Sequence, residues 1–168
     1  MESPKFHVQI IAGLLLSISL GMIPADVNAN ARANFVLKVV KFSRAHVLNK
    51  PTFDICVLGD NAVFNALKAK GGRTLHKRKL KVHKLSSAGQ APGKKCNVLY
   101  MGAGSASAAL YRKVLTISSG GDFAKRGGMV QYHAGGKSNL SVNIKSLRRA
   151  GLQLDLSLIK LARTVYRK

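Results

Sequence analysis

A glycine-rich stretch after a predicted strand has the spacing of a dinucleotide-binding loop. In VLYMGAGSASAAL, Gly102, Gly104 and Ser107 fall on the Gly-x-Gly-x-x-Gly pattern, and Asp122 lies twenty residues after Gly102. In that pattern the glycines admit a pyrophosphate and the acidic side chain binds a ribose. Here the third position is Ser rather than Gly or Ala. We therefore favour the alternative, a close-packed turn from a strand into a helix.

A second glycine-rich segment, SSGGDFAKRGGMV at residues 118–130, contains Gly120-Gly121-Asp122-Phe123. This is one residue short of the Gly-Gly-Asp-Glu-Phe signature of diguanylate cyclases. Such enzymes need acidic side chains to hold Mg²⁺ against a triphosphate. The Glu is absent here, and no acidic residue lies between Asp60 and Asp122. We interpret the segment as a turn whose glycines supply positive φ, with Phe123 in the core and residues 127–128 starting a hairpin.

The remaining polar residues do not form a recognisable catalytic or metal-binding set. The chain has five histidines and only six acidic residues. With so few acidic residues, a pair of carboxylates that could catalyse hydrolysis is not expected. Among the histidines, His76 and His83 sit among cations that would repel a metal ion. We predict that the protein is not an enzyme and uses no cofactor or metal.

Residues 1–29 have the composition of a secretory signal peptide. An uncharged apolar run, IIAGLLLSISLGMI, spans residues 10–23 and is too short for a comfortable transmembrane helix. Pro24 ends the run, and small residues allow cleavage after Ala29 or Ala31. We predict an exported protein with a single domain over residues 32–168. An uncleaved N-terminal anchor is the alternative.

Two cysteines, Cys56 and Cys96, lie near the start of the apolar runs FDICVLGD and KKCNVLYMGA. In an oxidising compartment, two cysteines favour one disulfide. The sulfurs could meet if these runs are neighbouring strands of one sheet. Two separate buried thiols are the alternative.

The charge composition is the most unusual property of the chain. It has 28 Lys and Arg against 6 Asp and Glu, a formal net charge of +22. Such an excess indicates an anionic partner. Nucleic acid is disfavoured by export and by the absence of interleaved aromatic side chains that would stack on bases. Anionic envelope polymers or lipids, or an acidic protein face, fit better. The basic patch that would carry this binding comprises Lys77, Arg78, Lys79, Lys81 and Lys84.

Hydrophobic patterning predicts strands alternating with helices, followed by a hairpin. A first helix is expected over residues 33–45, and a final helix in DLSLIKLARTVYRK with Asp155 as its N-cap. Further helices are expected in NAVFNALKAKGG and SASAALYRK, strands in FDICVLGD, KLKVHKL, CNVLYMGA and VLTISSG, and a hairpin in MVQYHAGGKSNLSVNI. The prediction is a three-layer α/β domain with a mainly parallel sheet, an antiparallel C-terminal hairpin and flanking helices.

Over nearly all of residues 32–166 the chain resembles the YfiR-like family of periplasmic regulatory proteins. The resemblance rests on ANFVLKVVKFS, DICVLGDNAVFNAL and CNVLYMGA, and most specifically on VLTISSGGDFAKRGGMVQY and SVNIKSLRRAGLQLDLSLIKLAR. In the last two segments the family positions are occupied by Phe123, Gly127, Gly128, Met129, Asn143, Ala150, Gly151, Leu152, Leu158, Leu161, Ala162 and Arg163.

The resemblance implies a non-catalytic regulator that binds and represses the periplasmic sensor domain of an inner-membrane diguanylate cyclase, lowering cyclic di-GMP and biofilm formation. It also implies a tendency to form homodimers. Cys56 and Cys96 match one family disulfide, whereas a second, C-terminal cysteine pair is absent. The aromatic-Pro sequence usual after the first helix is also missing.

We expect the hairpin and the C-terminal helices to contact the partner, through Arg148, Arg149 and Leu158. The alternative function is that of a basic envelope protein that binds anionic polymers or lipids through residues 77–84.

Overall fold

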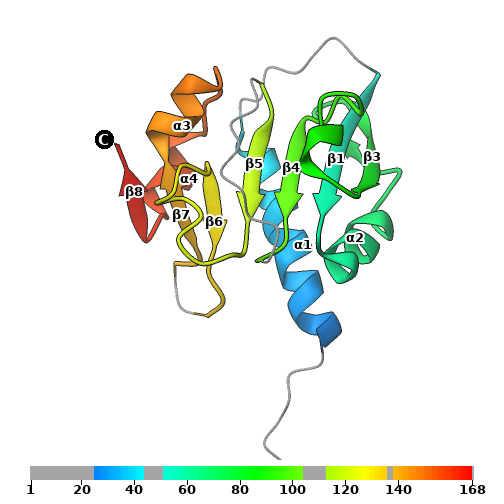
Figure 1. The fold of residues 1–168 in the computed structure, drawn as a ribbon, viewed down its shortest axis with the longest axis horizontal. Helices are drawn as coiled ribbons and strands as arrows, with labels where there is room; N and C mark the ends of the chain where they lie inside the picture. The colour runs from blue at the N-terminus through cyan, green and yellow to red at the C-terminus, as the bar shows by residue number, and fades with distance from the viewer. Residues whose placement is uncertain (1–24, 44–50, 104–112, 136–137, 168) are drawn as a thin grey trace, which may run out of the picture.

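The computed structural model describes residues 25–43, 51–103, 113–135 and 138–167, which form one mixed eight-stranded sheet with flanking helices (Figure 1). The strand order is β2-β3-β1-β4-β5-β6-β7-β8. Among the strand pairs of the described residues, β2–β3 and β6–β7 are antiparallel and the others are parallel. The predicted fold class is therefore confirmed. The strands are β1 (Thr52–Leu58), β2 (Thr74–Leu75), β3 (Arg78–Leu85), β4 (Val98–Met101), β5 (Leu115–Ser118), β6 (Val130–Tyr132), β7 (Leu140–Asn143) and β8 (Thr164–Tyr166).

The two faces of the sheet bury different hydrophobic clusters because side chains alternate along each strand. In β1, Ile55 and Val57 belong to the larger cluster, which also contains residues of the helices. Cys56 and Leu58 point to the other face and belong to a smaller cluster. The helices are α1 (Ala25–Lys41), α2 (Asn61–Lys68), α3 (Ile144–Arg149) and α4 (Leu156–Lys160), and a short 3-10 helix, η1, spans Ala88–Gln90.

Helix α1 lies along the back of the sheet in Figure 1 and packs against α2. Its Phe35 ring lies 4.9 Å from the ring of Tyr132 in β6, so the helix links the two halves of the sheet. The predicted first helix covered residues 33–45, but α1 ends at Lys41, and Ser43 then makes a bridge to Leu154.

Helix α1 also contains both predicted cleavage positions, and Ala29 is 2% exposed. The apolar run that suggested a signal peptide lies outside the described residues, so export remains a prediction. The predicted helix over SASAALYRK also lies almost entirely outside them. Among the described helices, none is both long and apolar enough to cross a membrane.

The C-terminal segment differs most from prediction. Asp155 is the expected N-cap, accepting a hydrogen bond from Ser157 N at 3.1 Å, but α4 ends after five residues at Lys160. The chain then forms β8, parallel to β7, where a continued helix was predicted. The open edge of β7 explains the difference. It offers backbone partners to a segment whose β-branched Thr164 and Val165 suit a strand, and Arg163 N already donates to Leu140 O.

Candidate partner-binding surfaces and the disulfide site

The predicted basic patch lies on one edge of the sheet. Strand β3 pairs with β1 along its length but with the two-residue β2 only at Arg78 and Lys79. Lys79, Lys81 and Lys84 are exposed, as is Lys77 in the preceding turn.

The structure does not gather all five cations on one face. Lys79 and Lys81 share a face, Lys84 lies on the other, and Arg78 is half-buried with its guanidinium 5.9 Å from the Phe53 ring centroid. Exposed lysines at a sheet edge also prevent edge-to-edge aggregation, so this placement has a structural role besides any binding role.

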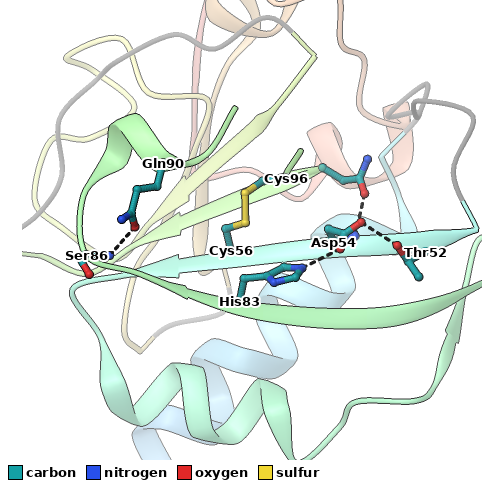
Figure 2. The surroundings of a disulfide bond; sticks show 8 residues. Thr52, Asp54, Cys56, His83, Ser86, Gln90 and Cys96 are labelled. Atoms are coloured by element: carbon teal, nitrogen blue, oxygen red, sulfur yellow. Dashed lines mark hydrogen bonds and ion pairs between the residues drawn. A yellow bond between two sulfur atoms is a disulfide. The ribbon is translucent and has the colours of Figure 1, made fainter. Parts of the chain in front are cut away.

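The disulfide joins the centre of β1 to the residues that precede β4 (Figure 2). Cys56 and Cys96 are bonded with their Cα atoms 5.8 Å apart, as expected from the neighbouring strands. Both are buried, at 0% and 1% exposure, within the smaller cluster. Reduction of this bond therefore requires local opening of the domain.

A polar network beside the disulfide was not predicted from the sequence. His83 is the register partner of Cys56, and its Nε2 lies 2.7 Å from Oδ1 of Asp54 (Figure 2). The other carboxylate oxygen accepts a 2.9 Å hydrogen bond from Thr52 Oγ1. Asp54 N donates to Asn97 Oδ1, and Asn97 N donates back to Asp54 O, at 2.7 and 2.8 Å.

This network connects β1 to β3 and to the start of β4, around an Asp54 carboxylate that is almost fully buried. Buried carboxylates need such hydrogen bonds to offset their lost hydration. The only sequence signal was a charged residue within an apolar strand. Partners 29 and 43 residues away could not be read from spacing.

The Gly-Gly-Asp-Phe segment is a turn with a buried anchor. Phe123 is 1% exposed, as predicted. Positive φ angles fall on Gly127, a glycine as predicted, and also on Asp122, which is not a glycine.

Hydrogen bonds attach this turn to the C-terminal half of the domain. Ala124 N donates to Gln131 Oε1, Asn143 Nδ2 donates to Ala124 O, and Ser146 Oγ donates to Gly127 O, at 3.1, 2.7 and 2.8 Å. The polar groups around Phe123, including the Asn143 side chain, therefore have a structural role: they fix the turn to β6, β7 and α3.

The described part of the dinucleotide-like loop is explained by packing. A Cβ added to Gly102 would lie 2.4 Å from the carbonyl oxygen of Gly59, so only glycine fits there. Gly104 and Ser107 lie outside the described residues. The finding supports the close-packed turn that the sequence favoured.

Polar side chains near the carboxyl ends of β1 and β4 form hydrogen bonds and an ion pair with one another. Asp60 caps α2 by accepting from Val63 N at 3.0 Å, and it forms a 3.3 Å ion pair with Arg32 of α1. The Tyr100 hydroxyl contacts Asp60 and Ser119, and burial raises the pKa of Tyr100 to about 12. These contacts hold α1 and α2 to the carboxyl ends of β1 and β4.

The three predicted partner-binding residues are not equivalent. Arg148 and Arg149 are exposed at the end of α3. Leu158, in contrast, is 1% exposed and packs in the larger cluster, so its expected role as a contact residue is corrected to a core role. Helical periodicity placed it on the same face as Leu161, which is 54% exposed because the chain has already left α4.

Exposed apolar surface beside Arg148 was missed by the sequence reasoning. Leu156 is 62% exposed, and it lines a groove of about 340 Å³ together with Arg148, Ile159 and Arg167. We call this groove and the adjacent Arg149 the C-terminal surface. Large exposed apolar side chains flanked by charges are typical of protein interaction sites.

Comparison with known families decides the relationship suggested by the sequence. The family model described as YfiR/HmsC-like matches residues 29–163, which is most of the chain. The chain belongs to the YfiR/HmsC-like family. No curated protein matches it.

The YfiR/HmsC-like family is one of periplasmic regulatory proteins associated in general with diguanylate cyclases. The matched region contains strands β1 to β7, both cysteines and the Phe123 turn, and it ends just before β8. In this member of the YfiR/HmsC-like family, the Gly-Gly-Asp-Phe sequence is therefore part of the regulator's own fold.

Truncating two leucines near the C-terminus tests the corrected role of Leu158. We expect Leu158→Ala to lower the free energy of unfolding by about 2–5 kcal/mol, because it empties part of the core. Leu161→Ala should change it by less than about 0.5 kcal/mol, because that side chain is mostly solvated. Urea unfolding followed by circular dichroism measures both. Equal effects would mean that Leu158 is not a core residue.

Proposed function

We propose that this protein binds the periplasmic sensor domain of an inner-membrane diguanylate cyclase and represses the enzyme, which lowers cyclic di-GMP and biofilm formation. Family membership supports the regulatory role. The observation that supports the binding site is the C-terminal surface, where Leu156 is 62% exposed beside Arg148 and Arg167. An apolar centre with an Arg rim is the composition that protein interfaces favour.

Charge reversal on α3 tests this proposal. We expect Arg148→Glu/Arg149→Glu to weaken binding of the isolated sensor domain by about tenfold or more, because like charges replace complementary ones. In cells, cyclic di-GMP should rise to the level of the deletion strain. Surface plasmon resonance and nucleotide extraction give the two measurements.

The matched control is Lys81→Glu/Lys84→Glu, which makes the same change in net charge on the opposite edge of the sheet. This variant should retain sensor binding and repression. A deletion strain with unchanged cyclic di-GMP would contradict the repressor role. Full binding by the Arg148/Arg149 variant would contradict this location of the site.

A second function, binding to anionic envelope polymers through the basic patch, has its own support. Lys77, Lys79, Lys81 and Lys84 are all exposed there, and β3 contains no acidic residue. If this function dominates, the Lys81/Lys84 variant elutes from heparin at clearly lower salt than the Arg148/Arg149 variant. Equal elution would indicate that only net charge matters.

Homodimer formation and cleavage of the leader remain predictions. Light scattering after size exclusion and mass spectrometry of the mature N-terminus test them directly.

A further inference from the structure

A groove between the last turns of α1 and the β2–β3 hairpin shares no lining residue with the basic patch or the C-terminal surface. Its volume is about 420 Å³, and we call it the α1 groove. Its apolar lining comprises Leu80, which is 3% exposed, and the partly buried Leu37, Phe42 and Leu75, which pack against the larger cluster. The groove is thus an extension of the core that opens to solvent.

Both walls of the α1 groove are held in place by hydrogen bonds. The His76 ring, in the turn between β2 and β3, places Nε2 2.9 Å from the carbonyl oxygen of Val40 in α1. Leu80 N donates to Arg73 O at 2.8 Å, which fixes the start of the hairpin. The hairpin therefore does not need to move to form the groove.

Three cations surround the mouth of the α1 groove. Lys38 and Lys41 come from α1, Arg73 comes from the opposite wall, and all three are exposed. Within the described part of the chain, no carboxylate forms an ion pair with any of them. Lysines in the last turn of a helix also interact favourably with the helix dipole, which would account for Lys38 and Lys41. It does not account for Arg73 on the opposite wall.

We propose that the α1 groove binds a single-chain anionic amphiphile, of the fatty-acid or lysophospholipid class. The acyl chain lies on Leu37, Phe42 and Leu75, and the carboxylate or phosphate lies between Lys38, Lys41 and Arg73. The volume is at the lower end of the range of about 300–1,000 Å³ for small-molecule sites, which suits one acyl chain. An anionic polymer would use the cations but leave the apolar lining exposed to water.

Calorimetric titration of the purified protein tests the proposal. The probes are decanoate and monodecyl phosphate, each below its micelle concentration, with uncharged decyl maltoside as the control. We expect one saturable site for the anions and binding of the maltoside weaker by about tenfold or more, because charge-assisted contacts are lost. The stronger of the two anions distinguishes a fatty acid from a phospholipid source.

Two variants with equal net charge then locate the site. Lys38→Gln/Arg73→Gln should weaken anion binding by about tenfold or more, whereas Lys81→Gln/Lys84→Gln should leave it within about twofold. Lys41→Gln and Leu75→Ser should each also weaken binding, since one removes a cation and the other part of the apolar lining.

Three results would overturn the proposal: no saturable binding, equally tight binding of decyl maltoside, or equal losses in the two double variants. Melting curves confirm that each variant is folded. All altered side chains are at least partly exposed, so the fold is expected to tolerate these changes.

Discussion

Replacing both cysteines by alanine is expected to lower the free energy of unfolding by about 4 kcal/mol. The bond joins residues 40 apart, and a cross-link of that span removes much of the unfolded chain's freedom. It also connects β1 directly to the segment before β4, within the smaller hydrophobic cluster.

Urea unfolding with and without a thiol reductant measures the contribution of the disulfide. The wild type should lose about 4 kcal/mol when it is reduced, and Cys56→Ala/Cys96→Ala should match the reduced wild type and show no response to reductant. A double variant as stable as the oxidised wild type would show that the bond contributes nothing. Because both sulfurs are buried, reduction of the native wild type should be slow until denaturant opens the domain.

Adding one methyl group at Gly128 is expected to destabilise the domain strongly. An added Cβ would lie 2.2 Å from Cε1 of Phe123, and the ring is buried, so neither group can move without disturbing the core. We expect Gly128→Ala to cost about 1–3 kcal/mol, as overpacking does. Phe123→Ala should cost about 3–5 kcal/mol, because it leaves a cavity.

The double variant distinguishes this steric account from a general effect of glycine loss. In Phe123→Ala/Gly128→Ala the new methyl group occupies space that the ring has left, so the total loss should be smaller than the sum of the two. Gly121→Ala is the control, since a Cβ there meets nothing within 4 Å, and it should be nearly neutral. Additive losses at residues 123 and 128 would contradict the account.

The two candidate surfaces lie at opposite ends of one continuous sheet. The basic patch follows β3, and the C-terminal surface lies beside β8. In the order of the sheet, five strands separate β3 from β8. This separation allows each surface to be altered without direct contact with the other. Variants of one surface are therefore fair controls for the other.

Local patterns in the sequence predicted much of the fold. Continuous apolar runs predicted the central strands β1, β4 and β5, whose residues are nearly all buried. Glycines between two strand patterns predicted the β6–β7 hairpin, and Asp155 was correctly placed as an N-cap. The hairpin and the N-cap depend on interactions between residues close in sequence, and the central strands depend on burial on both faces of the sheet. Each of these requirements restricts residue types in a way that is visible in the sequence.

Tertiary structure decided the features that depend on distant segments. After Lys160, Leu161, Ala162 and Val165 continue the helical spacing of apolar residues, yet the chain forms β8 because β7 offers an unpaired edge. Leu158 is buried within α4, whereas Leu161, at the C-cap where the helix has ended, is exposed. The Asp54–His83 contact and the α1 groove likewise join residues 29 or more apart in sequence. Periodicity shows which side of a segment is apolar, but the partner that covers it is set by packing free energy across the whole domain.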